Sequence, residues 1–144
     1  MNSDPEPPNH HPVHPRVLVV EDNVEQAVLL TEWLEQQRVE VTVAKGPDYA
    51  ADALAHMHAA HAGNAPFHMA ILDLRLGQQS GLGVSLVRAI KSGFRATHVV
   101  ICSGDANLLV DSISVCGYCG VLYKPFSPSE IRRMLIVHRL PVPD

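Results

Sequence analysis

Short apolar runs alternate along this chain with longer segments whose apolar residues recur every three or four positions. A short apolar run bounded by turn residues predicts a buried strand, and the longer spacing predicts an amphipathic helix. The runs predict five strands, at residues 16–20, 39–44, 69–72, 98–102 and 120–123. With their N-caps, the intervening segments predict helices over about 23–38, 47–61, 84–91, 107–115 and 127–139.

Several predicted helices begin with recognisable signals. Asn23 and Gln26 have the spacing of a capping box, in which the N-cap and the third helical residue bond each other's backbone N–H. The segment Ser127–Glu130 repeats this spacing and adds a proline at the first helical position. Pro47 is likewise expected at the first position of the second helix. These signals support the helix assignments.

The alternation of strands and helices predicts the fold class. Such a pattern is typical of a parallel sheet that is covered by helices on both faces. We expect an α/β, doubly wound (flavodoxin-like) sheet of five parallel strands in the order 2-1-3-4-5, with five helices on two faces. Ligands of such sheets bind beyond the carboxyl ends of the strands, here between strands 1 and 3.

The length of 144 residues predicts a single domain. Residues 1–15 contain five of the eleven prolines and three of the nine histidines, so we expect a disordered N-terminal tail. The folded domain is expected over 16–140. Residues 141–144 are expected to be a C-terminal tail or the start of a linker, because prolines there stop the last helix.

Composition narrows the possible functions. The net charge of -4, with acidic and basic residues interleaved, does not favour direct binding to nucleic acid. We expect no membrane segment, because no apolar run approaches the roughly 20 residues that a membrane helix needs. Three cysteines, an odd number, favour reduced thiols and a cytoplasmic location.

Polar side chains follow four of the predicted strands. Glu21 and Asp22 follow the first strand, Asp73 the third, Ser103 the fourth and Lys124 the fifth. The predicted strand order brings these side chains to one edge of the sheet. Three close carboxylates repel one another, and a hard divalent cation such as Mg²⁺ would relieve that repulsion.

This set of side chains suits the transfer of a phosphoryl group. Asp73 ends the central strand between the other carboxylates, so we interpret it as the nucleophile that forms an aspartyl phosphate. The metal ion, the Lys124 ammonium and the Ser103 hydroxyl would stabilise the charge on the transferring oxygens.

Four motifs carry a resemblance to a known family: V-L-V-V-E-D, I-L-D-L-R-L, I-C-S-G and Y-K-P-F. In order and spacing they resemble the CheY-like receiver domain of response regulators in two-component signal transduction, over residues 16–139. The resemblance implies a phosphorylation-controlled switch and not a metabolic enzyme, with no activity beyond its own phosphorylation and dephosphorylation.

The resemblance also implies residue roles. Asp73 would be the phosphoacceptor, and Glu21 and Asp22 would hold Mg²⁺ together with Asp73 and the backbone carbonyl of Arg75. Ser103 and Lys124 would contact the phosphoryl group. The peptide bond before Pro125 would be cis, as essentially only proline allows.

The chain departs from the family at two positions. Val121 stands where the family usually has an aromatic switch residue, and either Tyr118 or Tyr123 is a candidate to replace it. Gly77 replaces a family proline and is expected to loosen its loop.

Arg75 and Asp105 occupy positions that tune phosphate lifetime in the family. We expect them to form an ion pair that hinders water and slows hydrolysis of the aspartyl phosphate.

Two alternatives remain. One is a Mg²⁺-dependent hydrolase of the haloacid dehalogenase type, which shares the aspartate nucleophile but has a second Asp where this chain has Arg75. The other is a receiver-like scaffold that is never phosphorylated. A flavin site is disfavoured, because the loop after the first strand is acidic.

The resemblance finally implies partners. A sensor histidine kinase or a histidine phosphotransfer protein would donate the phosphoryl group. A downstream protein or a fused output domain would bind the surface formed by the fourth helix, the fifth strand and the fifth helix. The same surface could form a homodimer.

Overall fold

The computed structural model describes residues 14–45, 47–74, 80–116 and 119–144. Almost all of the expected N-terminal tail lies outside these ranges. The strands are β1 Arg16–Val20, β2 Glu40–Val43, β3 Met69–Asp73, β4 His98–Ser103 and β5 Gly120–Tyr123. The helices are α1 Val24–Gln36, α2 Tyr49–Ala62, α3 Ser80–Gly93, α4 Ala106–Cys116 and α5 Pro128–Val137.

The five strands form one parallel sheet in the order β2-β1-β3-β4-β5, which confirms the predicted fold class. The register pairs Val20 of β1 with Leu72 of β3, and Asp73 with Cys102 of β4. Residues that follow β1 and β3 therefore begin at the same level of the sheet. This register brings Glu21, Asp22 and Asp73 to one edge.

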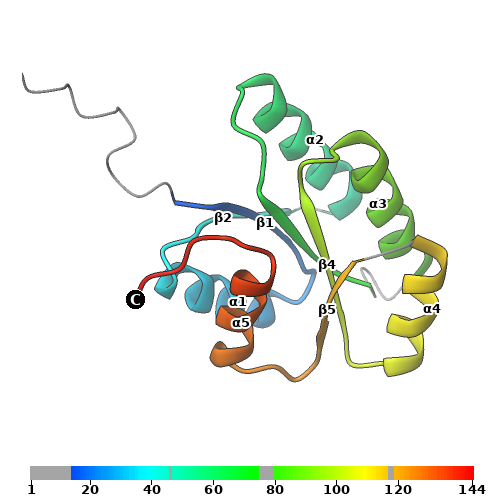
Figure 1. The fold of residues 1–144 in the computed structure, drawn as a ribbon. Coiled ribbons are helices and arrows are strands. Elements are labelled where there is room, and N and C mark those ends of the chain that lie inside the picture. Colours follow the sequence, from blue (N-terminus) through cyan, green and yellow to red (C-terminus); the bar gives the residue numbers. More distant parts are fainter. Residues whose placement is uncertain (1–13, 46, 75–79, 117–118) are drawn as a thin grey trace, which may run out of the picture.

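Helices cover both faces of the sheet (Figure 1). Successive strand residues point to opposite faces, so β1 contributes to two cores. Val17 and Val19 pack with residues of α1 and α5, whereas Leu18 and Val20 pack with residues of α2, α3 and α4. Because apolar side chains cover both faces of the sheet, the charged side chains of a functional site have room at the strand ends.

Two predicted helix starts were wrong. α2 begins at Tyr49, with Asp48 as its N-cap, and not at Pro47. The Asp48 side chain accepts a hydrogen bond from the N–H of Ala51 and so satisfies a backbone donor in the first turn of the helix. Proline has no side-chain acceptor that could do this. α3 begins at Ser80 rather than Val84, so Gly81 and Gly83 lie within the helix despite the low helix propensity of glycine.

The end signals of α5 were correct. Ser127 and Glu130 form the predicted capping box at the start of α5. The Lys124–Pro125 peptide bond is cis, as expected. Beyond α5, the side chain of Val142 packs against the core shared by α1 and α5. None of the described helices has the length and apolar character needed to cross a membrane.

Close packing fixes the start of α3 against the end of β3. A Cβ atom on Gly83 would lie 2.6 Å from the backbone oxygen of Leu74 and 2.8 Å from its Cα. Leu74 directly follows Asp73, so this contact also supports the edge where the carboxylates meet. Only glycine allows so close an approach.

We expect Gly83→Ala to lower the free energy of unfolding by about 2 kcal/mol, because backbone atoms must move to admit the methyl group. Gly93→Ala is the matched control at the other end of α3, where a new Cβ meets nothing within 4 Å. It should leave stability unchanged or raise it by up to about 1 kcal/mol. Urea unfolding of both variants measures the difference, and equal stability of Gly83→Ala and wild type would contradict the close packing.

Candidate functional site: an acidic pocket at the strand ends

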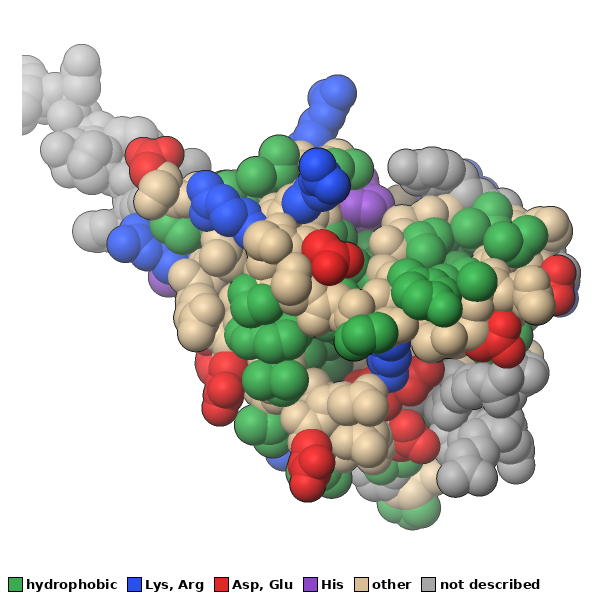
Figure 2. Space-filling model, turned by 90° about the horizontal axis from the view of Figure 1, so that it is seen from below, with side chains coloured by type: hydrophobic (Ala, Val, Ile, Leu, Met, Phe, Trp, Pro, Cys, Tyr) green, Lys and Arg blue, Asp and Glu red, His purple; other side chains and the backbone are tan. Residues whose placement is uncertain are grey.

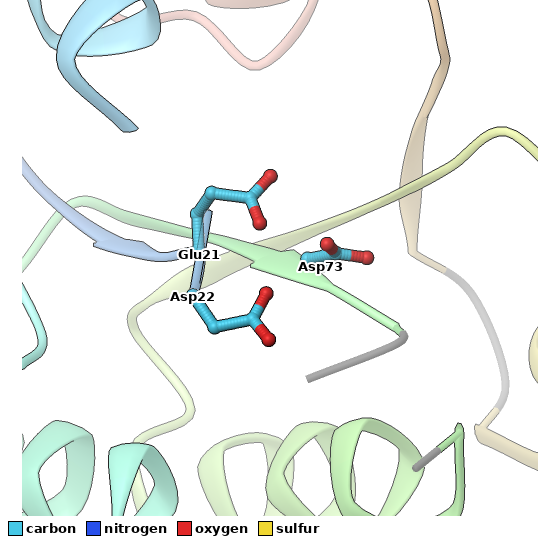
Figure 3. A group of neighbouring side chains, drawn as sticks. All are labelled: Glu21, Asp22 and Asp73. Atoms are coloured by element: carbon cyan, nitrogen blue, oxygen red, sulfur yellow. The ribbon is translucent and has the colours of Figure 1, made fainter. Parts of the chain in front are cut away.

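Three strands deliver charged side chains to the carboxyl edge of the sheet. Glu21 and Asp22 follow β1, Asp73 ends β3, and Lys124 follows β5. Figure 3 shows the carboxylates of Glu21 and Asp22 on either side of the end of β1, both next to that of Asp73. Parallel strands place their carboxyl ends together, so residues more than 100 positions apart become neighbours.

The carboxylates form a tight cluster. Glu21, Asp22 and Asp73 each offer an oxygen, and these oxygens lie within 4.8 Å of one another. Glu21 is 6% exposed and Asp73 is 7% exposed. Water therefore screens the negative charges poorly, and their repulsion must be offset within the protein or by a bound cation.

Lys124 supplies the positive charge at the cluster. Its Nζ lies 2.7 Å from Oε1 of Glu21 and 3.2 Å from Oδ2 of Asp73. Burial alone would lower the pKa of Lys124, but the hydrogen bond to Glu21 and the charge of Asp73 raise it above its ordinary value. Lys124 therefore stays protonated at neutral pH.

The cluster remains short of positive charge. Burial in the first place, and also the hydrogen bond and charge of Asp73, raise the pKa of Glu21 to about 7, although Lys124 opposes this shift. Among the residues that the structure describes, three carboxylates beside one ammonium leave two negative charges when all are ionised. A divalent cation with oxygen ligands would balance them, and Mg²⁺ prefers such ligands. The residues present thus fit the metal that the sequence led us to expect.

Ser103 lies at the same edge but its hydroxyl is turned to the backbone. It is 2% exposed, and its Oγ accepts a hydrogen bond of 3.0 Å from the N–H of Asp105. The Asp105 side chain in turn accepts a bond of 3.1 Å from the N–H of Leu108. Asp105 thereby caps α4, so this short chain of bonds links the end of β4 to the next helix.

Some expected features lie outside the described residues. Arg75 and Gly77 are among them, so the Arg75–Asp105 ion pair and the loosened loop stay predictions. Tyr118 also lies outside. Val121 and Tyr123 are both exposed and alternate with the buried Leu122, so Tyr123 shares the outward face of Val121.

The structure adds one residue that the sequence did not reveal as part of the site. The side-chain oxygen of Gln26 lies 2.6 Å from Nζ of Lys124. The sequence suggested that Gln26 would bond the backbone N–H of Asn23, but Oε2 of Glu21 accepts from that group instead. No local signal could have shown this contact, because Gln26 and Lys124 are 98 positions apart.

Two hollows adjoin the cluster on either side of α1. One, of about 400 Å³, is lined by Glu21, Lys124, Leu29, Trp33 and Phe126, among others. The other, of about 630 Å³, is lined by residues that include Glu21, Asp22, Val24 and Val28. Figure 2 shows hydrophobic side chains over much of the face that also carries acidic and basic side chains. The charged cluster thus has apolar surroundings.

Comparisons with known proteins agree with this architecture. The family model of the response regulator receiver domain matches residues 17–136. A search of curated proteins finds no significant match.

Solved structures of receiver domains are similar in fold. A CheY-like receiver domain protein from Methanospirillum hungatei JF-1 has a TM-score of 0.70 and 20% identity, over 87% of this chain and 93% of that chain. CheY4 of Vibrio cholerae has a TM-score of 0.69 and 22% identity, over 88% and 99%. NtrX from Brucella abortus has a TM-score of 0.67 and 26% identity, over 88% of this chain and 27% of that one.

The family match covers most of the chain, and the strand order and acidic pocket are those that the match requires. The chain therefore belongs to the family of response regulator receiver domains, which act as phosphorylation-controlled signalling switches.

Proposed function

We propose that Asp73 of this receiver domain accepts a phosphoryl group from the phosphohistidine of a sensor histidine kinase or a histidine phosphotransfer protein. The observation that carries the proposal is the position of the Lys124 ammonium, in contact with both Asp73 and Glu21 at the buried strand ends. An ammonium placed there can contact a phosphoryl group on Asp73.

We propose that Glu21, Asp22 and Asp73, with the backbone carbonyl of Arg75, hold Mg²⁺. The support is the charge of the cluster and its set of hard oxygen donors. The bound metal would supply positive charge opposite the phosphoryl oxygens.

In the proposed transfer, an oxygen of the Asp73 carboxylate forms a bond to phosphorus. The bond between phosphorus and the donor imidazole nitrogen breaks, and its electron pair stays on the imidazole. Lys124 donates a hydrogen bond to the transferring oxygens, and burial of Asp73 keeps bulk water from the acyl phosphate. The product on this chain is an aspartyl phosphate.

Phosphorylation would then move Ser103. Its hydroxyl now accepts from the N–H of Asp105, and we propose that it turns to donate to the phosphoryl group. Because Asp105 caps α4, this turn would favour a different position of that helix. Val110 of α4 and Val121 and Tyr123 of β5 are exposed, which supports this surface as the binding site of a downstream protein, an output domain or a second copy.

We also propose that the phosphodonor binds across α1. Val24 and Val28 lie one helical turn apart, and with Leu29 they are 74%, 52% and 44% exposed. These side chains line the two hollows that also contain Glu21, Asp22 and Lys124. A helical donor that buries them would bring its phosphohistidine close to Asp73. We expect this phosphoryl transfer to occur in the cytoplasm, and the support for this location is membership of the receiver family.

The proposed phosphorylation can be tested with acetyl phosphate and Mg²⁺. Wild type should take up a stoichiometric, acid-stable and base-labile phosphoryl label, whereas Asp73→Asn and protein treated with a chelator should not. Asp111→Asn, which alters an exposed carboxylate of α4, is the matched control and should be labelled normally. Continuous hydrolysis of p-nitrophenyl phosphate without a stable label would instead indicate a hydrolase, and no label under any condition would indicate a scaffold.

The proposed donor surface can be tested with Val28→Glu. A charge in the buried centre of an interface should slow transfer from a phosphorylated histidine phosphotransfer domain by about tenfold or more. Labelling by acetyl phosphate should be unchanged, because this small donor needs no protein surface. Ala59→Glu adds the same charge to an exposed position of α2 and should transfer normally. If Val28→Glu slowed both reactions equally, or slowed neither of them, the proposed donor surface would be contradicted.

A further inference from the structure

All three N–H donors of the Lys124 ammonium have acceptors in the structure. Glu21 accepts at 2.7 Å, Asp73 at 3.2 Å and Gln26 at 2.6 Å. The bond to Asp73 is the longest. Glu21 and Gln26 therefore hold the ammonium on two sides and leave its third N–H directed at the nucleophile.

Gln26 reaches Lys124 because of how α1 begins. Its backbone N–H donates to Oδ1 of Asn23, which fixes Gln26 at the third position of the helix. In a capping box its side chain would return to the N–H of Asn23. That N–H already donates to Oε2 of Glu21, so the Gln26 amide is directed to the ammonium instead.

We propose that Gln26 is a positioning residue, which holds the Lys124 ammonium where it can contact a phosphoryl group on Asp73. This inference rests on the function proposed above. A free lysine stem has several rotatable bonds, and ordering it costs entropy at each binding event. Gln26 orders the stem in advance. Since the amide is neutral, it adds no negative charge that would oppose an incoming phosphoryl group.

Three variants separate positioning from a structural role. Gln26→Met removes the acceptor but keeps the length and helix propensity of the side chain. Gln26→Glu keeps an acceptor of the same shape but adds a charge that binds the ammonium more strongly. Gln36→Met makes the first change at an exposed position at the other end of α1.

The first readout is the binding of beryllofluoride in the presence of Mg²⁺. This binding is measured by the fluorescence of Trp33, which lines the hollow beside Lys124. Loss of a hydrogen bond to a charged group should weaken the affinity of Gln26→Met, and slow its labelling by acetyl phosphate, by about tenfold. Gln26→Glu should bind beryllofluoride at least as weakly as Gln26→Met does, because its added charge binds the ammonium more strongly. Gln36→Met should behave as wild type.

A structural role predicts a different pattern. Glu at the third helical position favours capping and the helix dipole, so Gln26→Glu would then be as stable and as active as wild type. Positioning by Gln26 makes a further prediction for metal-free protein. NMR of the Lys124 ammonium should show faster hydrogen exchange in Gln26→Met than in wild type. The Mg²⁺ affinity of Gln26→Met should stay within about twofold of wild type, because Gln26 is no metal ligand.

The inference is overturned if Gln26→Met binds beryllofluoride as wild type does, if Gln26→Glu is fully active, or if the Mg²⁺ affinity of Gln26→Met falls in parallel. It is also overturned if ammonium exchange is the same in both proteins. Absence of labelling in wild type itself would overturn the proposed function, and this inference with it. If wild type were labelled at Asp73 and the Gln26 variants bound beryllofluoride and were labelled as wild type is, the inference alone would be overturned and the proposed function would stand.

Discussion

The pairing of one partly buried ammonium with two buried carboxylates, in a cluster of three, is the constraint on which this structure depends. Lys124 contacts Glu21 and Asp73 in a place that water screens poorly. A buried charge is tolerated only when it is paired and hydrogen-bonded. The fold therefore has to deliver residues from β1, β3 and β5 to one point, and the parallel sheet does so by aligning its strand ends.

The same constraint explains why neighbouring polar groups are connected to the cluster. One oxygen of Glu21 accepts from Lys124 and the other from the N–H of Asn23, at the start of α1. The first turn of that helix provides Gln26. At the far side, Ser103 and Asp105 link β4 to α4. Any change of charge at Asp73 is thus adjacent to the starts of two helices, which is a suitable arrangement for a switch.

Most of the fold could be predicted because its signals are local. The buried runs of β1 and β3 are almost wholly apolar, and α5 begins with a complete capping box. The candidate site followed from topology, since Asp73 ends β3 and Lys124 follows β5 of one parallel sheet.

The failures have a different origin. α2 starts at Tyr49, after its N-cap Asp48, because a side-chain acceptor outweighs the preference of Pro47 for a first position. The role of Gln26 depends on Lys124, far along the chain, and on competition for the N–H of Asn23. The direction of the Ser103 hydroxyl depends on the turn that follows β4. Such contacts are decided in three dimensions, and the pattern of residues does not contain them.

A crystal structure with Mg²⁺ and beryllofluoride would test the central claim most directly. The account predicts beryllium bound to a carboxylate oxygen of Asp73, with Lys124 Nζ and Ser103 Oγ within hydrogen-bond distance of its fluorides. Magnesium should lie among Glu21, Asp22 and Asp73. Beryllofluoride bound elsewhere, or a Lys124 ammonium that stays away from it, would contradict the claim that this cluster is a phosphoryl site.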